Sequence, residues 1–268
     1  MDYTVNGNDI IVSENDLDLD ETLDCGQAFR WKKIDSDHIC TYTGSFLNSN
    51  LTVSQRDDGL FVFHDTTEQD FLEKWVRYFD FETDYSELKR QFSEDETLSK
   101  ACSFAGGMRL LRQDSWEALI SFIISQNNNI PRIKGIIERL CEHYNGRFPS
   151  SQELDAESID SLSYLRSGFR AKYIADAANK TASGIVDLSA IAAMPLDDAR
   201  TALKTIAGVG PKVAECVLLY GMYRTEAFPI DVWIKRVLEQ FYPNGFPEIA
   251  KSHAGIAQQY LFHYIRCC

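Results

Sequence analysis

Residues 203–216, Leu-Lys-Thr-Ile-Ala-Gly-Val-Gly-Pro-Lys-Val-Ala-Glu-Cys, are the stretch that decides the fold class of this 268-residue chain. Gly208 and Gly210 flank Val209 between two segments of helical pattern. Glycine lets the backbone adopt positive φ and approach a ligand closely, and Pro211 suits the first turn of a helix. We therefore predict a helix–hairpin–helix whose turn, Gly208, Val209 and Gly210, presents N–H groups to an anion such as a DNA phosphate. Because many helix pairs use such a turn, a purely structural connection is the alternative.

Lys212 stands in the first turn of the second predicted helix, where a cation opposes the helix dipole. That position disfavours the charged ammonium, and a neutral lysine is a nucleophile suited to Schiff-base chemistry. The alternative is a solvated surface lysine that contacts phosphate. Cys216 lies one turn further on and on the same side, so its thiol could line a pocket beside the amine.

Asp231 lies in the segment 229–233, Pro-Ile-Asp-Val-Trp, directly before an apolar-periodic helix. Its residue type and place predict a helix N-cap. A carboxylate fixed there could also face Lys212 and stabilise positive charge on a reacting sugar.

The pattern of apolar residues changes from alternating to helical near residue 68. Turn dipeptides such as Asn6-Gly7 and Asp58-Gly59 separate short alternating runs that predict an antiparallel meander, with strands at 9–12, 28–34, 38–43, 50–54 and 60–64. Downstream spacing predicts helices, which we place at 71–79, 115–124, 131–144, 171–183, 196–206, 211–223, 232–241 and 248–264, with Ser115 as the cap of the second. The predicted fold class is α+β: an N-terminal antiparallel β domain with flanking helices at 1–100, followed by a helical bundle at 101–268.

The charge is unevenly distributed along the chain. The formal net charge is −13, but residues 1–100 hold 23 of the 40 Asp and Glu residues and 9 of the 27 Lys and Arg residues, so the rest of the chain is nearly neutral. A local basic face is therefore compatible with the second part. We expect a positive band across 109–134, 166–172 and 204–212, and an outward-facing acidic β portion. A soluble acidic protein without a polyanion partner is the alternative that composition alone favours.

The composition is that of a globular protein, with 44% hydrophobic and 25% charged residues, which excludes a disordered chain or a collagen. No apolar run approaches a membrane span, and no secretory signal opens the chain. The seven cysteines form no paired framework, so we expect a reduced, cytoplasmic and nucleoid-associated protein, without a membrane partner.

Five motifs, taken together and in order, resemble the 8-oxoguanine DNA glycosylase branch of the helix–hairpin–helix DNA glycosylase superfamily, in a bacterial or archaeal variant. They are the hairpin with its aspartate segment, Cys-Gly-Gln-Ala-Phe-Arg-Trp at 25–31, Arg-Leu-Leu-Arg-Gln-Asp at 109–114, Gln-Asn-Asn-Asn-Ile-Pro-Arg-Ile at 126–133 and Ala-Gln-Gln-Tyr-Leu-Phe at 257–262. The chain departs from the family where Ala207 replaces the usual proline and Phe169 the usual tyrosine. Trp233 replaces a histidine that contacts phosphate in vertebrate-type members, and we expect it to be buried and structural.

The resemblance implies base excision repair of DNA: excision of 8-oxoguanine from double-stranded DNA, opposite cytosine, with strand cleavage by β-elimination. A base within a duplex must be flipped out before attack. Lys212 would attack the sugar and form an imine, and Asp231 would support the cationic sugar. The Gly26 carbonyl would accept the additional ring N–H of the lesion, which guanine lacks. Base recognition would further use Cys216, Gln258 on the Watson–Crick edge and Phe262 as a stacking ring.

On the opposite strand, the resemblance implies that Asn127 fills the space of the extruded base. Arg132 and Arg170 would bond the cytosine, and Phe169 would wedge into the stack. No cofactor is required, although the carbonyls of Lys204, Ile206 and Val209 match a structural monovalent or divalent cation site. We expect a monomer whose partner is DNA containing 8-oxoguanine.

Two other functions are alternatives. A monofunctional glycosylase for alkylated bases would usually lack the hairpin lysine, so Lys212 argues against it. A non-catalytic helix–hairpin–helix DNA-binding protein would bind DNA without releasing a base. From the residues alone, a turn glycine at Gly26 and a core aromatic at Phe262 are the simpler interpretations.

Overall fold

The structure is a computed structural model that describes residues 1–267, and its contacts divide the chain into two compact units. Unit 1 combines Met1–Arg112 with the segment from Ile230 onward, and unit 2 is Gln113–Pro229. The predicted boundary between residues 100 and 101 follows the change in charge distribution along the sequence. The contacts instead divide the chain twice, because the C-terminal helices pack with the N-terminal part.

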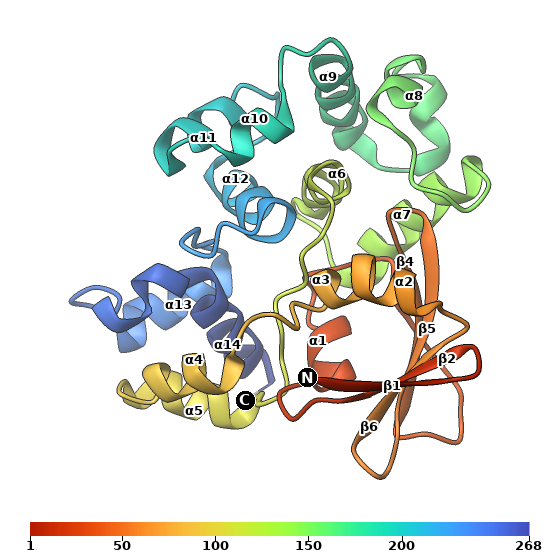
Figure 1. Cartoon of the computed structure of the whole chain (residues 1–268). Coiled ribbons are helices and arrows are strands. Elements are labelled where there is room, and N and C mark those ends of the chain that lie inside the picture. Colours follow the sequence, from red (N-terminus) through yellow and green to blue (C-terminus); the bar gives the residue numbers. More distant parts are fainter. Residues whose placement is uncertain (268) are drawn as a thin grey trace. The chain divides into compact units, whose positions relative to one another are not determined.

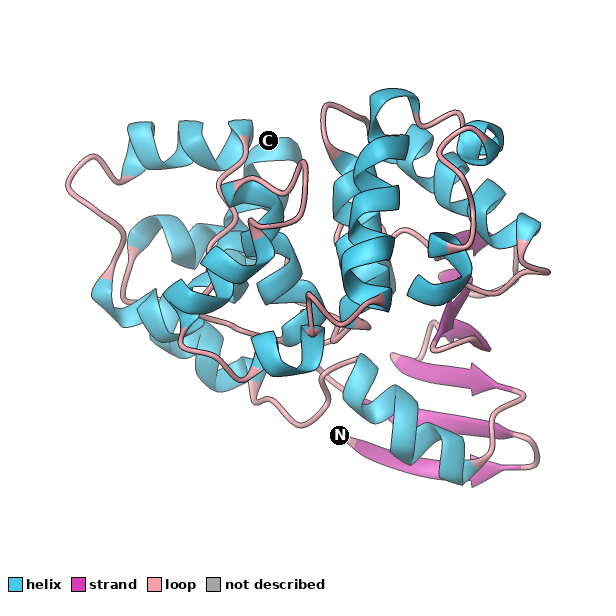
Figure 2. Cartoon of the chain, turned by 90° about the horizontal axis from the view of Figure 1, so that it is seen from above, coloured by secondary structure: helices cyan, strands magenta, loops and turns pink. Residues whose placement is uncertain are grey.

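Unit 1 is built on one six-stranded antiparallel sheet in the order β1-β2-β6-β5-β4-β3. Its strands are drawn as arrows in Figure 1 and in magenta in Figure 2. Its strands are β1 (Asp2–Asn6), β2 (Asp9–Ser13), β3 (Lys32–Ile34), β4 (Cys40–Phe46), β5 (Ser49–Gln55) and β6 (Leu60–His64). The fold class is thereby confirmed, with two differences. β1 was not predicted, and β6 closes back onto β2, so only β3 to β6 form the expected meander.

The strands form where short turns meet alternating apolar residues. Gly7 has φ +63° in the turn after β1, as the Asn6-Gly7 dipeptide predicted. In β2, Ile10 and Val12 are fully buried, and Ile11 between them is half-buried. Residues 28–31, predicted as strand, are a loop instead. Trp31 is buried there and donates from its indole nitrogen to the Tyr78 hydroxyl over 2.7 Å.

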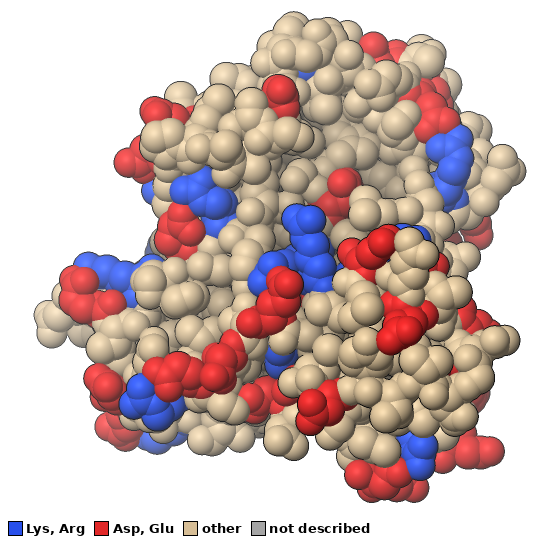
Figure 3. All heavy atoms as spheres, in the orientation of Figure 1, with Lys and Arg blue, Asp and Glu red and all other residues tan. Residues whose placement is uncertain are grey.

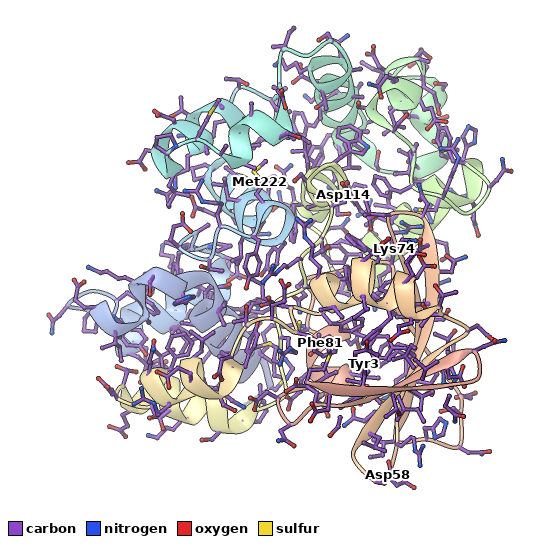
Figure 4. The ribbon with its side chains drawn as sticks, viewed as in Figure 1. Tyr3, Asp58, Lys74, Phe81, Asp114 and Met222 are labelled. Atoms are coloured by element: carbon purple, nitrogen blue, oxygen red, sulfur yellow. The ribbon has the colours of Figure 1, made fainter. Side chains whose placement is uncertain are left out.

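A helical segment covers the sheet and closes an aromatic core. It runs through α2 (Glu68–Asp70), the π-helical turn η1 (Phe71–Trp75) and α3 (Val76–Tyr78). Phe71 and Trp75 are buried against strand residues of the same core. Tyr3 and Phe81, labelled in Figure 4, both contact the Phe71 ring, at centroid distances of 5.4 and 6.5 Å.

The C-terminal helices belong to unit 1 because they pack on α4 and α5, as Figure 1 shows. Tyr260 stacks edge-on against Phe92 at 6.4 Å and donates its hydroxyl to the Met108 carbonyl over 3.0 Å. Tyr242 donates to the Asp95 carboxylate over 2.7 Å. Besides the segment over the sheet, the helices of unit 1 are α1 (Leu19–Leu23), α4 (Tyr85–Phe92), α5 (Glu96–Phe104), α13 (Val232–Phe241), η5 (Glu248–His253) and α14 (Ala254–Cys267).

Unit 2 is helical, as predicted. Its elements are α6 (Ser115–Ser125), α7 (Ile130–His143), α8 (Ser151–Asp155), η2 (Ser161–Leu165), η3 (Gly168–Arg170), α9 (Ala171–Ala182), α10 (Leu188–Ala192), α11 (Leu196–Leu203), α12 (Pro211–Cys216) and η4 (Val217–Gly221). The predicted cap of α6 was wrong by one residue. Asp114, labelled in Figure 4, accepts from the Glu117 N–H, while the Ser115 hydroxyl donates to the Gly221 carbonyl. Among residues 1–267, no helix is long and apolar enough to cross a membrane.

Candidate functional site

The hairpin of unit 2 has the predicted form. α11 ends at Leu203, Gly208 turns the chain with φ +79°, and α12 begins at Pro211. The Val209 N–H donates to the Ile206 carbonyl over 3.0 Å inside the turn. Gly210 is the N-cap of α12 and offers no side-chain oxygen to the helix N-terminus, which therefore keeps its capacity for an external anion.

Lys212 lies in the first turn of α12, and its side chain is half-buried. Its ammonium nitrogen lies 5.3 Å from the centroid of the Phe122 ring. Within the described part of unit 2, no carboxylate lies at ion-pair distance from it. Cys216, at the end of α12, is 2% exposed. The amine thus lies beside an aromatic ring and, among the described residues of its own unit, without a carboxylate that would hold it in a salt bridge.

The two hairpin helices are joined by an ion pair. The Arg200 guanidinium of α11 donates to the Glu215 carboxylate of α12 through Nε at 2.5 Å and a terminal nitrogen at 3.1 Å. The second oxygen of Glu215 also accepts from the Phe228 N–H over 2.7 Å. Hydrogen bonding to Glu215 raises the pKa of Arg200, so this link stays charged.

Helix α9 contacts the hairpin turn through three side chains that the sequence analysis missed. The Asp176 carboxylate accepts from the Ala207 N–H over 2.7 Å, and the Lys180 ammonium donates to the Thr205 carbonyl over 2.7 Å. Lys180 and Asp176 also form an ion pair at 2.9 Å. The Tyr173 ring covers Gly208 so closely that a Cβ there would lie 2.4 Å from the ring. The one sequence feature that could have indicated these contacts is Ala207. It stands where the resemblance leads us to expect proline, and unlike proline it has an N–H group that needs an acceptor.

The asparagine loop and its neighbours lie together in unit 2. Asn127 is exposed with φ +46°, while the Asn129 side chain caps α7 by accepting from the Arg132 N–H over 3.0 Å. Phe169, the predicted wedge, is 50% exposed. Arg132 is exposed as well, so these side chains can reach a ligand.

Arg170 departs from the prediction that it bonds cytosine. The residue is 2% exposed, and its guanidinium donates to the carbonyls of Gln126, Asn127 and Ser167, with the Asn127 bond at 3.0 Å. It also lies 4.4 Å from the centroid of the Phe169 ring. Burial, followed by the charge of Arg132, lowers the pKa of Arg170. Because its guanidinium makes four hydrogen bonds to backbone carbonyls, Arg170 here holds the asparagine loop and the wedge in place.

Asp231 and the predicted base-recognition residues other than Cys216 lie in unit 1. Asp231 is the N-cap of α13, as predicted, and accepts from the Trp233 and Ile234 N–H groups at 2.9 Å each. Trp233 is only half-buried, contrary to the expected full burial, and the Arg236 guanidinium lies 5.0 Å from its ring centroid. Lys212 belongs to the other unit, so its approach to Asp231 stays a prediction.

The glycine loop of unit 1 is fixed by Gln27, which is fully buried. Its amide donates to the Thr22 and Arg109 carbonyls at 2.8 Å each and accepts from the Leu111 N–H at 2.9 Å. The motifs at 25–31 and 109–114 thus meet through one side chain. Gly26 itself has φ +93°, a backbone conformation that favours glycine.

Gln258 and Phe262 both lie on α14. Gln258 is 3% exposed, and its amide oxygen is one of three buried side-chain polar atoms without a hydrogen-bond partner in the described chain. A buried acceptor left in this state is costly and therefore points to a ligand. Phe262 is half-buried under the Arg266 guanidinium, which lies 4.9 Å from its ring centroid and donates to the Cys25 carbonyl over 3.3 Å. Arg266 therefore links the stacking residue to the loop next to Gly26.

Only some of the cations in the predicted positive band are exposed and can contact DNA. Arg109 is 1% exposed and donates to the Phe79, Asp16 and Asp80 carbonyls, and Arg112 pairs with Asp80 at 2.5 Å, so both serve the interior of unit 1. In unit 2, the exposed cations in the predicted ranges are Arg132, Arg166, Lys172 and Lys204. On the face drawn in Figure 3, acidic side chains gather over α2 and the turn between β5 and β6, in keeping with an acidic unit 1.

Two family models match the chain. The description "8-oxoguanine DNA glycosylase, N-terminal domain" matches residues 9–119, and "HhH-GPD superfamily base excision DNA repair protein" matches residues 120–251. A probable N-glycosylase/DNA lyase of Methanothermobacter thermautotrophicus is 33% identical over 242 residues, which cover 75% of this chain and 77% of that protein.

Solved structures agree with this assignment. The structure of MBOgg1 in complex with a low-affinity DNA ligand is 39% identical, with a TM-score of 0.90 and 99% of each chain covered. The 8-oxoguanine glycosylase/lyase of Clostridium acetobutylicum, solved with double-stranded DNA that contains cytosine opposite 8-oxoguanine, is 33% identical, with a TM-score of 0.89 and again 99% of each chain covered. With the hairpin, the lysine and the glycine loop in place, the chain belongs to the 8-oxoguanine DNA glycosylase/lyase family of the HhH-GPD superfamily of base excision DNA repair proteins.

Proposed function

We propose that the chain excises 8-oxoguanine from double-stranded DNA, with cytosine as the preferred opposite base, and then nicks the strand through a lysine imine. The observation that carries this proposal is Lys212 in the first turn of α12, against Phe122 and without a carboxylate partner in the described part of its own unit. An alkylated-base glycosylase that uses water has no need of such an amine.

In the proposed reaction, the Lys212 nitrogen attacks the anomeric carbon of the damaged nucleotide, and the bond from that carbon to the base breaks. The base leaves with the electron pair of that bond and takes up a proton. The secondary amine loses its proton, the bond between the anomeric carbon and the ring oxygen breaks, and that oxygen takes up a proton as the protonated imine forms. β-Elimination then removes a proton from carbon 2′ and breaks the bond from carbon 3′ to oxygen, so that the 3′ phosphate leaves with the electron pair of that bond. Asp231 would stabilise the positive charge that develops on the sugar.

Two features of unit 1 support recognition of an oxidised purine. The unpartnered amide oxygen of Gln258 can accept a hydrogen bond from the Watson–Crick edge of guanine, which carries N–H donors. In the described residues, no donor bonds the Gly26 carbonyl, which can accept the N–H that distinguishes 8-oxoguanine. A site that depends on such a bond rejects the analogue that lacks the donor.

Contacts to the strand opposite the lesion are proposed for Asn127, Arg132 and Phe169, since each is accessible. The hairpin N–H groups of residues 208–210 would hold a phosphate of the damaged strand. The carbonyls of Lys204, Ile206 and Val209 are proposed as a structural cation site. We also propose that the protein acts as a monomer.

The test is borohydride trapping on a duplex with 8-oxoguanine opposite cytosine, with Lys212→Gln and, as control for the loss of a lysine, Lys100→Gln on the exposed face of α5. We expect a covalent adduct for the parent and the control and none for Lys212→Gln, which should still bind the duplex. A parent that releases the base without forming an adduct would contradict the imine. Absence of release from every damaged duplex would indicate a binding protein.

A second variant separates the two roles of Asp231. Asp231→Asn keeps an oxygen that can cap α13 but removes the negative charge, so the melting temperature should stay near that of the parent while excision falls. Replacement of cytosine by adenine, guanine or thymine in the same duplex measures the opposite-base preference.

A further inference from the structure

The hairpin turn of this chain lacks a residue that the family signature uses to fix it. Proline holds φ near −65° and donates no hydrogen bond, so it stiffens a turn without a partner. Ala207 gives up that restraint and adds an N–H group. An unrestrained turn would allow the hairpin, and Lys212 five residues later, to sample other conformations.

The α9 clamp, defined here as Tyr173, Asp176 and Lys180, lies on the part of the turn that the substitution loosens. The three residues share one face of α9, because three and four positions separate them. Asp176 accepts the hydrogen bond from the additional N–H of Ala207 at 2.7 Å. Lys180 binds the Thr205 carbonyl at 2.7 Å, and the Tyr173 ring packs on Gly208.

The positive charge of Lys180 explains why an acidic side chain is tolerated beside the phosphate-binding turn. A lone carboxylate beside a phosphate-binding turn would repel the phosphate. The Lys180 ammonium lies 2.9 Å from the Asp176 carboxylate and offsets its charge, so the clamp adds no net charge to the turn. Both side chains are partly buried, at 25% and 29% exposure, which limits the competition from water.

We infer that the hydrogen bond from Ala207 to Asp176 replaces the rigidity of the missing proline, so that Asp176 is a positioning residue for the hairpin and hence for Lys212. Its effect on catalysis rests on the proposed function, whereas its effect on the hairpin does not. Asp176 should therefore affect the rigidity of the hairpin, and through it excision, only when residue 207 has an N–H group to donate.

The experiment is a double-mutant cycle of Asp176→Ala and Ala207→Pro in the full chain. Hydrogen exchange of the amides in 204–212 is measured in the free protein, and single-turnover excision of 8-oxoguanine in the duplex. Asp176→Ala alone should accelerate hairpin exchange and slow excision by about tenfold, the factor expected for a hydrogen bond to a charged group. Ala207→Pro alone should leave exchange slow, and in that background Asp176→Ala should have no further effect.

Asp176→Asn, which keeps an acceptor, should retain slow exchange, and melting curves show that each variant is folded. Two results would overturn the inference: unchanged hairpin exchange in Asp176→Ala, or an equal effect of Asp176→Ala with alanine and with proline at position 207. The two proposals can fail separately. If the parent excises no 8-oxoguanine but the double-mutant cycle gives the expected hydrogen-exchange rates, the proposed function is refuted and the role of the α9 clamp is supported.

Discussion

The Arg170 guanidinium donates to the Asn127 carbonyl over 3.0 Å, so a buried arginine fixes the residue proposed to enter the space of the extruded base. Asn127 has φ +46°, in the left-handed region that asparagine tolerates better than most residues, and Arg170 bonds its carbonyl in that conformation. The loop therefore depends on Arg170.

Arg170→Lys should weaken discrimination between opposite bases more than it weakens excision itself. Lysine keeps the charge but cannot bond several carbonyls at once in a planar fork. We expect the ratio of excision rates opposite cytosine and opposite adenine to fall by about tenfold, as for the loss of one charged hydrogen bond. Arg147→Lys, at an exposed ion pair with Glu153, is the control. An unchanged ratio would show that the asparagine loop keeps its conformation without the hydrogen bonds from Arg170.

Gln258→Leu should stabilise the protein and impair excision. The substitution removes a buried amide oxygen without a partner, whose cost is about 1–3 kcal/mol. The melting temperature should rise by about 2–4 °C per kcal/mol in a chain of this size, as calorimetry would show. Excision should fall because the Watson–Crick edge of the base loses its acceptor. A lower melting temperature would indicate that the amide is structural.

Gly208→Ala and Gly210→Ala form a matched pair in the hairpin. At Gly208 the backbone has φ +79°, and a Cβ would lie 2.4 Å from the Tyr173 ring, whereas at Gly210 no atom lies within 4 Å of a Cβ. Left-handed backbone alone costs an alanine about 1–2 kcal/mol. Thermal melting should therefore show a clear loss for Gly208→Ala and little change for Gly210→Ala. Equal losses would contradict the role of Tyr173.

Acid should destabilise unit 1 through Asp16 and Asp20. Burial acts to raise the pKa of each carboxyl, but hydrogen bonds from Lys89 and Ser86 to Asp16, and from Lys33 and Tyr42 to Asp20, outweigh it and leave both values lowered. A pKa that is lower in the folded state gives stability above the unfolded value, near pH 4, and this stability is lost as the pH falls through the folded value. Glu21, whose pKa burial raises, acts in the opposite sense.

The measurement is the melting temperature between pH 7 and pH 2 for the parent and for the double variant Asp16→Asn and Asp20→Asn. The variant should lose less stability in acid than the parent. Parallel curves would mean that other carboxylates dominate the acid transition.

The sequence predicted those features that short-range chemistry determines. α13 begins at Val232 after its Asp231 cap, α12 begins at Pro211, and β6 covers the predicted 60–64. Each rests on a cap, a proline or an alternation within a few residues. The hairpin turn and the fold class follow from the same local signals.

Features that depend on contacts between residues far apart in the chain could not be predicted from the sequence. Nothing local indicates that β2 pairs with β6, that the C-terminal helix packs on α5, or that Asp176 bonds a residue 31 positions away. The sequence shows that Arg170 and Arg109 are cations, but it does not show that their guanidinium groups donate hydrogen bonds to backbone carbonyls in the interior. Arg170, assigned to the opposite strand by resemblance, and Arg109, included in the expected positive band, are therefore interior hydrogen-bond donors here.

Because unit 1 combines residues before 113 with residues after 229, it can be completed during synthesis only after the C-terminal helices have been translated. Unit 2 is complete once Pro229 has left the ribosome, but the helices around Phe92 and Met108 lack their partner until Tyr260 has been translated. The nascent sheet unit therefore exposes apolar helix faces throughout elongation of unit 2, a period in which aggregation competes with folding. A premature stop codon after residue 229 would consequently release a product in which the helix faces around Phe92 and Met108 stay uncovered, although, among the described residues, the aromatic core of the sheet contains none beyond Leu111.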